Sequence, residues 1–456
     1  MNRNVFFSVL LGIAVAACGD DDGGSDAGTD SAVDAPVPDV PGTDSDNPMC
    51  PGSGDVVIDT DITADTTWSC PAYLLQGTIF VTGDSTLRID PGVQIFGDTA
   101  TPFSALIVTR GSQLIAEGTA DDPIVFTSGN AESERATGDW AGVALLGAAT
   151  INNGADAGGG VLEGRLEGID ASDDRALYGG SDDASNCGSL EYVRIEFAGA
   201  ELSPDNELNG LTVAGCGTGT NLSFVQVHRG KDDGIEFFGG TAGMDHVVIT
   251  GASDDSLDWD LGWRGDVQFL VVHQYAGIGD SGIEADNLGS DEDATPRSNP
   301  RIYNATFIGT PDTRGMVLRE GTRATLRNFI IQDFGSEAVD LRAAEVDLSA
   351  EWPTNLSIEN SFFFNNGAYA TETGDEDDDM GFIEQDAIED AARNNTVGTD
   401  PEIGDTSETA PNYVPSADLS GQATPPSGFD ATATYAGAFE PSGTDWSAGW
   451  TAYPVN

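Results

Sequence analysis

The sequence predicts an all-β solenoid, a right-handed parallel β-helix, and three observations indicate this fold. Short runs of β-branched and aromatic residues are separated by Gly, Asn and Asp. Six units that begin at a small residue recur 22 to 33 residues apart, and each carries a second apolar run. Helical periodicity is nearly absent. Such a repeat predicts coils whose equivalent strands pair in parallel, about 4.8 Å apart.

The repeating units place the solenoid along the chain. They begin at Gly210, Gly234, Ser256, Gly282, Gly315 and Ala338. Their second apolar runs span residues 222–228, 245–250, 267–273, 302–309, 326–332 and 356–364. Residues 77–97, 105–128 and 140–151 fit the same scheme as the first coils, with less regular spacing. The Gly- and Asp-rich segment 152–186 predicts an insertion that leaves the solenoid from one face.

The first residues predict export. Arg3 precedes an apolar run at residues 5–17, which is too short to cross a bilayer as a helix. Small residues then lead to Cys18, a pattern that resembles the bacterial lipobox. The resemblance implies a signal peptide at 1–17, a lipid on Cys18 that anchors the protein to the membrane, and, because Gly19 follows, the outer membrane. An ordinary signal peptide beside an unrelated cysteine is the alternative.

The composition of the next segment predicts a disordered acidic tether at 18–49. Residues 19–49 hold nine Asp and no Lys or Arg, which leaves too little apolar surface for folding. We expect the β-helix domain at 50–365, followed at 366–456 by an acidic loop and an irregular aromatic C-terminal cap. The aromatic tail at 443–453 is expected to pack on an open coil end, because a last coil otherwise exposes its core.

The cysteines fit an oxidising compartment. Besides Cys18 there are four, and their spacing favours one disulfide between Cys50 and Cys70 and another between Cys187 and Cys216. Other pairings stay open at this point. A zinc site is disfavoured, because no CxxC occurs and the three His are not spaced for shared ligation.

Five segments carry long motifs. They are GDWAGVALLG (138–147), YVRIEFAG (192–199), ELNGLTVAGCGTGT (207–220), VQVHRGKDDGIEFFGGT (225–241) and DDSLDWDLGW (254–263). Together they resemble a family of bacterial secreted proteins and lipoproteins with pectate-lyase-like parallel β-helix folds. The resemblance covers about residues 70–365, and the Trp-containing tail is similar as well. It implies the fold, and it implies no activity because none is established for the family.

Carboxylates recur at equivalent places in three successive units, GKDDGIEFFGG (230–240), SDDSLDWDLGW (253–263) and GDSGIEADN (279–287). Strand alternation points every second side chain away from the core, so stacked coils should align these acids. One predicted outward row contains Glu236, Asp258 and Glu284. A second, shorter row contains Asp260 and Asp286. The turn before these strands carries Asp232, Asp254 and Asp280, with Asp233 and Asp255 beside them.

Neighbouring like charges repel by roughly 1 kcal/mol in water and by more at a protein surface, so we expect something to offset them. One candidate is Ca²⁺. Its predicted ligands are Asp232, Asp233, Glu236, Asp254, Asp255, Asp258, Asp260, Glu284 and Asp286. A second candidate is arginine, because Arg319 falls at the register of Asp260 and Asp286, and Arg342 follows. A third is protonation of some carboxylates, which general acid–base catalysis exploits.

A plainer interpretation is structural. The whole chain is acidic, with 77 Asp and Glu against 18 Lys and Arg, so acids would often align by chance. Asp also suits turns. The net charge of −59 excludes nucleic acid as a partner.

We favour a non-enzymatic surface, adhesive or glycan-binding role in the cell envelope, with Ca²⁺ as the cofactor and a polysaccharide or surface protein as the ligand. Trp263 and Tyr275 are the candidate ligand-binding residues, because exposed rings stack on sugars; the alternative, and the more frequent role of Trp in a β-helix, is packing in the core or at a turn. The alternative is a polysaccharide lyase or glycoside hydrolase that acts on acidic glycans. Its candidate catalytic residues are Asp233, Glu236, Asp255, Asp258, Arg229 and Lys231. The Gly-His-Gly and Arg-Ile-Lys motifs of galacturonan hydrolases are absent from the sequence.

Overall fold

The computed structural model describes residues 50, 55–101, 103–203, 206–369 and 379–456. The predicted signal peptide, the lipidated Cys18 and the acidic tether at 18–49 lie outside the described residues. Within the described part of the chain, no helix has the length and apolar character of a membrane span.

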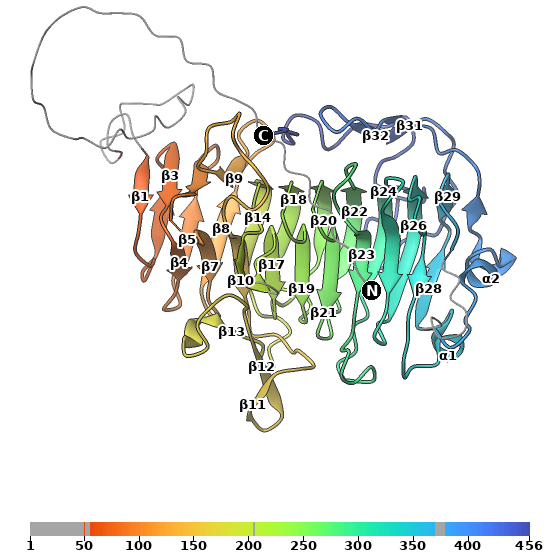
Figure 1. The fold of residues 1–456 in the computed structure, drawn as a ribbon, viewed down its shortest axis with the longest axis horizontal. Coiled ribbons are helices and arrows are strands. Elements are labelled where there is room, and N and C mark those ends of the chain that lie inside the picture. The colour runs from red at the N-terminus through yellow and green to blue at the C-terminus, as the bar shows by residue number, and fades with distance from the viewer. Residues whose placement is uncertain (1–49, 51–54, 102, 204–205, 370–378) are drawn as a thin grey trace, which may run out of the picture. The chain divides into compact units, whose positions relative to one another are not determined.

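The described part of the chain is a right-handed parallel β-helix, which confirms the predicted fold (Figure 1). One of its faces is a nine-stranded sheet in which every pairing is parallel. Its strands, in spatial order, are β4 (Thr78–Val81), β7 (Ala105–Val108), β10 (Gly142–Leu146), β17 (Leu211–Ala214), β19 (Ile235–Phe238), β21 (Leu257–Asp260), β23 (Ser281–Ala285), β25 (Arg314–Leu318) and β27 (Asp340–Leu341).

The other two faces form one sixteen-stranded sheet. Its early strands are β1 (Val56–Ile58), β2 (Thr66–Trp68), β3 (Ala72–Leu75), β5 (Thr86–Ile89), β6 (Gln94–Gly97), β8 (Gln113–Glu117) and β9 (Ile124–Ser128). The later ones are β14 (Gly188–Glu196), β18 (Asn221–His228), β20 (Met244–Thr250), β22 (Asp266–His273), β24 (Arg301–Ile308), β26 (Ala324–Gln332), β28 (Leu356–Glu359), β29 (Phe362–Phe364) and β30 (Thr396–Val397). Strand β14 pairs its first half with β8 and its second half with β9, so each long strand covers two faces.

A single left-handed residue turns the corner inside each long strand. The corner residues are Tyr192, Phe224, His246, Phe269, Asn304 and Asn328, with φ between 50° and 62°. This conformation is unfavourable for bulky side chains. Their stacking offsets part of the cost, because the four consecutive rings lie 4.4, 4.5 and 4.6 Å apart between centroids.

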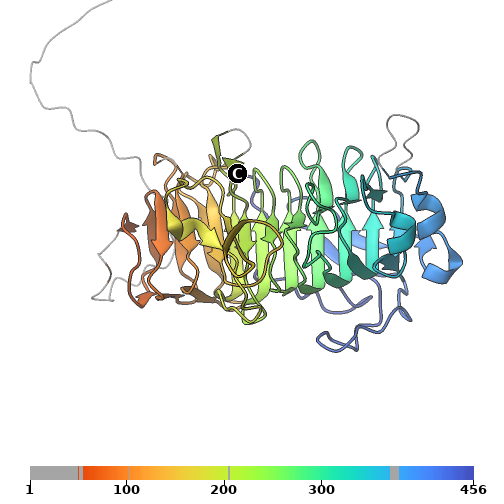
Figure 2. The same ribbon diagram turned by 90° about the horizontal axis from the view of Figure 1, so that it is seen from below.

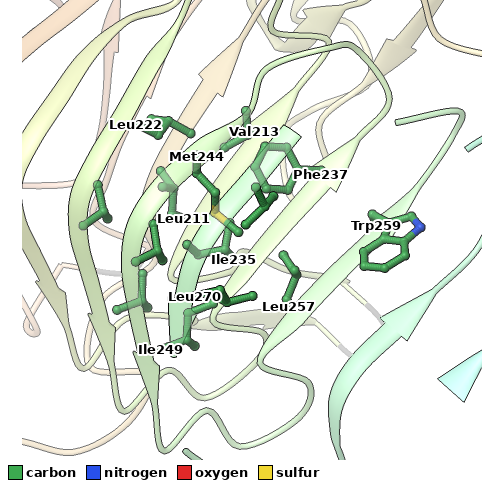
Figure 3. Packing of buried hydrophobic residues seen from close by; sticks show 14 of the residues in the cluster. Leu211, Val213, Leu222, Ile235, Phe237, Met244, Ile249, Leu257, Trp259 and Leu270 are labelled. Atoms are coloured by element: carbon green, nitrogen blue, oxygen red, sulfur yellow. The ribbon is translucent and has the colours of Figure 1, made fainter. Parts of the chain in front are cut away.

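Inside the coils, equivalent side chains stack in rows (Figure 3). Ile235 of β19 lies over Leu257 of β21, and Phe237 lies over Trp259, all four fully buried. The residue before each such strand must be small. A Cβ on Gly234 would lie 2.3 Å from the Ile249 side chain and 2.6 Å from the Ser256 carbonyl oxygen of the next coil. Coil stacking therefore explains why the repeating units begin at small residues.

The insertion predicted at 152–186 folds into a small antiparallel sheet beside the nine-stranded sheet (Figure 1). It contains β11 (Ala155–Gly158), β12 (Val161–Arg165), the 3-10 helix η1 (Asp174–Ala176) and β13 (Leu177–Tyr178). A second hairpin pairs β15 (Glu201–Ser203) with β16 (Asn206–Glu207). The two predicted disulfides, Cys50–Cys70 and Cys187–Cys216, are confirmed.

Short helices close the far end of the solenoid. They are α1 (Leu348–Glu351), α2 (Glu384–Ile388) and the 3-10 helix η3 (Ala391–Arg393). Helix α2 lies beyond β29 in Figure 1, and its Ile388 is fully buried in the main core. A helical segment, rather than the aromatic tail, therefore covers the core at this end.

The final segment, residues 398–456, is a strap that runs back along the outer side of the sixteen-stranded sheet (Figures 1 and 2). It contains β31 (Ile403–Asp405) and β32 (Asn412–Pro415). Its Trp450 packs in one cluster with Val248 and Val271 of the sheet. The expectation that the aromatic tail covers an open coil end is wrong, because the outward positions of these strands are apolar and the tail buries them instead.

Two histidines hold the strap. The ring of His228 lies 2.7 Å from Thr250 Oγ1 and 2.8 Å from the carbonyl oxygen of Pro454, and His273 Nδ1 lies 3.0 Å from the Tyr413 hydroxyl. Burial lowers the pKa of His228 to about 3 and that of His273 to about 4. Both are therefore neutral at pH 7 and serve as hydrogen-bonding anchors.

The steric role of the small residues predicts a large effect of one methyl group. Gly234→Ala should lower the free energy of unfolding by more than about 2 kcal/mol, because the new Cβ would overlap the next coil. Gly277→Ala is the control: its Cβ meets nothing within 4 Å, and only its φ of +77° opposes the change. The control should lose about 1 kcal/mol. Urea denaturation of both variants tests this, and equal losses would refute the steric explanation.

Candidate functional site

The predicted acidic face lies on the outer side of β19, β21 and β23. Glu236 pairs in register with Asp258, and Asp258 with Glu284. Each is half-buried, while the residues on either side of it in the strand point into the core. The structure thus brings these three carboxylates, from three coils, into one row.

A second and shorter row lies beside the first. Asp260 is followed along the row by Asp286, whose charge acts with burial to raise the pKa of Asp260 well above its usual range. In the preceding coil the equivalent position is Phe238. This row therefore has two acidic members, as the sequence predicts.

The acids at the turn have a structural task. Asp233 Oδ1 accepts a hydrogen bond from the backbone N–H of Asp255 at 3.0 Å, and Asp255 Oδ1 accepts one from the N–H of Ser281 at 2.6 Å. Each carboxylate therefore binds the backbone of the next coil. Both side chains are buried. This geometry supports the structural interpretation for these two residues.

Arginines neutralise the third coil. Arg319 Nε lies 2.8 Å from Asp286 Oδ1, and the same guanidinium pairs with Glu284. Arg314 Nη1 lies 2.6 Å from Asp280 Oδ1. Arg342 pairs with Asp340 at 2.6 Å. The predicted register of Arg319 with Asp286 is therefore correct.

In the described part of the chain, the outward carboxylates of β19 and β21 have no arginine partner. Among the described residues, no ion pair involves Glu236, Asp258 or Asp260. Burial raises the pKa of all three carboxyls well above the usual range, and neighbouring carboxylates raise it further. The Oδ1 atoms of Asp258 and Asp260 are buried without a hydrogen-bond partner. This part of the face therefore needs protons or a cation.

Three groups of carboxylates are close enough to share a metal ion. In each, one oxygen per residue lies within 4.8 Å of the others. The groups are Asp232, Asp233 and Asp254; Asp233, Glu236 and Asp258; and Asp254, Asp255 and Asp280. Oxygens on opposite sides of one Ca²⁺ are about 4.8 Å apart, so the spacing suits this ion. The predicted ligands Asp260, Glu284 and Asp286 belong to none of these groups.

Other parts of the chain complete the acidic face in ways that the sequence analysis missed. Asn209 donates a side-chain hydrogen bond to Glu236. Tyr178, from the insertion, packs against Phe238 with ring centroids 6.0 Å apart. Glu167, also from the insertion, adds its charge to those that raise the pKa of Glu236. No local motif marks these residues, because their contacts arise only when the insertion folds back on the sheet.

The expected aromatic platforms are absent from this face. Trp263 is fully buried, stacks on Phe237 at 4.2 Å between ring centroids and donates its indole N–H to the Ala242 carbonyl at 2.9 Å. Tyr275 lies buried beneath the strap, where its hydroxyl donates to the Glu408 carbonyl at 3.0 Å. The expectation that both rings are exposed is wrong, because one completes the core and the other anchors the strap.

The basic residues of the lyase alternative have other partners. Arg229 lies over the ring of Tyr275, 5.1 Å from its centroid, and forms an ion pair with Glu408 at 3.5 Å. Lys231 Nζ lies 2.7 Å from Glu201. Neither side chain is therefore placed as a free base over the acidic rows.

Comparison with known proteins agrees with the geometry. A family model described as a pectate-lyase like beta helix domain matches residues 60–451. The chain belongs to this family. In this pectate-lyase-like β-helix protein the match includes the insertion and most of the strap, so both are within the family's domain. Neither a curated protein nor a solved structure matches the chain.

The raised pKa values predict the pH dependence of the metal-free protein. Burial raises the pKa of Glu284 to about 7, against an ordinary value of about 4.3. Between these values the folded state binds more protons than the unfolded state, so stability falls as pH rises. The buried histidines act in the opposite direction, but only below about pH 6.5.

We therefore expect the melting temperature in chelator to fall from pH 6.5 to 7.5, where the Glu284 carboxyl loses its proton in the folded state. Glu284→Gln should weaken this fall, because its side chain no longer ionises. Scanning calorimetry of both proteins measures the effect. A profile that is flat over this range in the unmodified protein would contradict the pKa assignment.

Proposed function

We propose that this protein is a lipid-anchored cell-envelope protein that acts without catalysis as a surface, adhesive or glycan-binding protein, with calcium bound on its acidic face. Support for the anchor comes from the sequence, in the signal peptide at 1–17, Cys18 and the tether at 18–49. The outer membrane is the proposed location. In this proposal the acidic segment 18–49 links the lipid on Cys18 to the solenoid.

The calcium proposal rests on two stacked carboxylates, Glu236 and Asp258, whose negative charge no arginine of the described ranges offsets. Glu236 and Asp258 stack directly, and a buried oxygen of Asp258 has no hydrogen-bond partner. Asp233 brings a third carboxylate within ligand distance of both. Ca²⁺ prefers carboxylate oxygens in such numbers. An ion held there would link two coils and stabilise the fold by mass action, by about 2.7 kcal/mol at one hundred times its Kd.

The lyase and hydrolase alternatives have less support. Elimination needs a base over the sugar, and both Arg229 and Lys231 are engaged elsewhere. Hydrolysis needs two carboxyls with separate roles, and since Asp233 and Asp255 already bind backbone N–H groups, only Glu236 and Asp258 of the four candidates are left for it. The net charge of −59 would also repel an acidic glycan.

Neutralising one acid tests the calcium site. Ca²⁺ should raise the melting temperature of the unmodified protein by several degrees over that in chelator. Asp258→Asn should melt higher than the unmodified protein in chelator, because it removes a buried repulsive charge, and it should lose the response to Ca²⁺. Asp121→Asn, an exposed acid outside the face, is the matched control and should retain the response. A purely structural role for the acids predicts no calcium response in any of the three proteins.

The absence of catalysis is tested separately. We expect no unsaturated or reducing ends to be released from polygalacturonate, with or without Ca²⁺. Colorimetric assays of both kinds of end measure this. Release that disappears in Glu236→Gln, in a variant that keeps its melting transition, would replace this proposal with the enzymatic alternative.

A further inference from the structure

A cleft separates the strap from the sheet that it crosses. Its volume is about 690 Å³, within the range of small-molecule binding sites. The starts of β18, β20 and β22 form its floor, and strap residues between Gly428 and Trp446 form its wall. The cleft thus lies on a different sheet from the acidic face.

Aromatic rings line the cleft and are fixed in place by neighbours. His246 is held between Phe224 and Phe269, at centroid distances of 4.5 and 4.6 Å, and lies perpendicular to the ring of Trp446 at a centroid distance of 5.0 Å. Trp446 in turn stacks on Phe439 at 4.8 Å and donates its indole N–H to the Ala438 carbonyl at 2.8 Å. These rings need little ordering when a ligand arrives.

Three carboxylates line the same space: Asp245, Asp266 and Asp430. Asp266 forms an ion pair with Arg301, which binds both of its carboxylate oxygens, with Nε 2.7 Å from Oδ1. Asp430 is oriented by its own turn, in which Oδ1 accepts the Thr432 N–H at 2.9 Å. Buried Gln268 joins strap and floor, because its Oε1 accepts the Asp430 N–H at 2.7 Å. The acceptors are therefore held in place beside the rings.

We propose that this cleft binds a short neutral oligosaccharide. The partly exposed rings of His246 and Trp446 offer apolar surface to the C–H groups of sugars, and carboxylates accept strong hydrogen bonds from sugar hydroxyl groups. The net charge of −59 repels polyuronates. This inference deepens the proposed function by naming the glycan site and the sugar class, and it does not depend on the calcium site.

The strap offers a matched pair of variants. Asp430 and Asp418 are both exposed, and each accepts hydrogen bonds from the backbone and hydroxyl two residues later, Thr432 and Ser420 respectively. Only Asp430 lines the cleft. Asp430→Asn should weaken sugar binding roughly tenfold, because it loses a charged acceptor. Asp418→Asn should leave binding unchanged.

The experiment uses the full chain and neutral gluco-, xylo- and manno-oligosaccharides, with oligogalacturonate as the charged comparison, in isothermal titration. We expect binding of at least one neutral series and none of oligogalacturonate. Absence of neutral binding, equal losses in the two Asp variants, or tighter binding of oligogalacturonate would overturn the proposal. Asp258→Asn separates the two sites, because it should lose the calcium response and keep sugar binding. Asp430→Asn should keep the calcium response and bind the sugar more weakly.

Discussion

The structure depends on one constraint, the stacking of each strand on its equivalent in the next coil. Parallel pairing at this spacing leaves little room for a side chain just before β17 and β19, so Gly210 and Gly234 lie where a Cβ would overlap the next carbonyl. The register of this pairing also determines which side chains of successive coils lie next to each other. The core rows, the ring stack at the corners and the acidic rows all follow from the same register.

The acidic face shows the cost of this register. Stacking that favours apolar rows inside also places like charges next to each other outside. The chain offsets the repulsion differently in each place: with backbone N–H groups at Asp233 and Asp255, and with Arg319 in the third coil. Glu236 and Asp258 receive neither kind of partner, which makes them the chemically distinctive part of the face.

Local sequence was sufficient for everything that repeats. Alternation in IEFF and LDWD was enough to predict which side chains point inward, the Glu236–Asp258–Glu284 row and the position of Arg319. It was insufficient wherever a segment meets residues distant in sequence. Trp263 and Tyr275 look like surface aromatics in their own units, and their burial depends on the folding back of a turn and on the strap. The contacts of Tyr178 and Asn209 on the acidic face are equally non-local, as are the strap bonds of Gln268.

The strap has a consequence for the order of events during synthesis. A coil contacts its neighbours within a few tens of residues, so coils can form one after another as the nascent chain emerges. Strap contacts join partners much further apart, 132 residues for Ala438 and Thr306 and 256 for Trp450 and Arg194. Closing loops of that size comes late. Until the last segment is made, an apolar flank of the growing solenoid stays uncovered, and this is the stage at which the protein is most exposed to self-association.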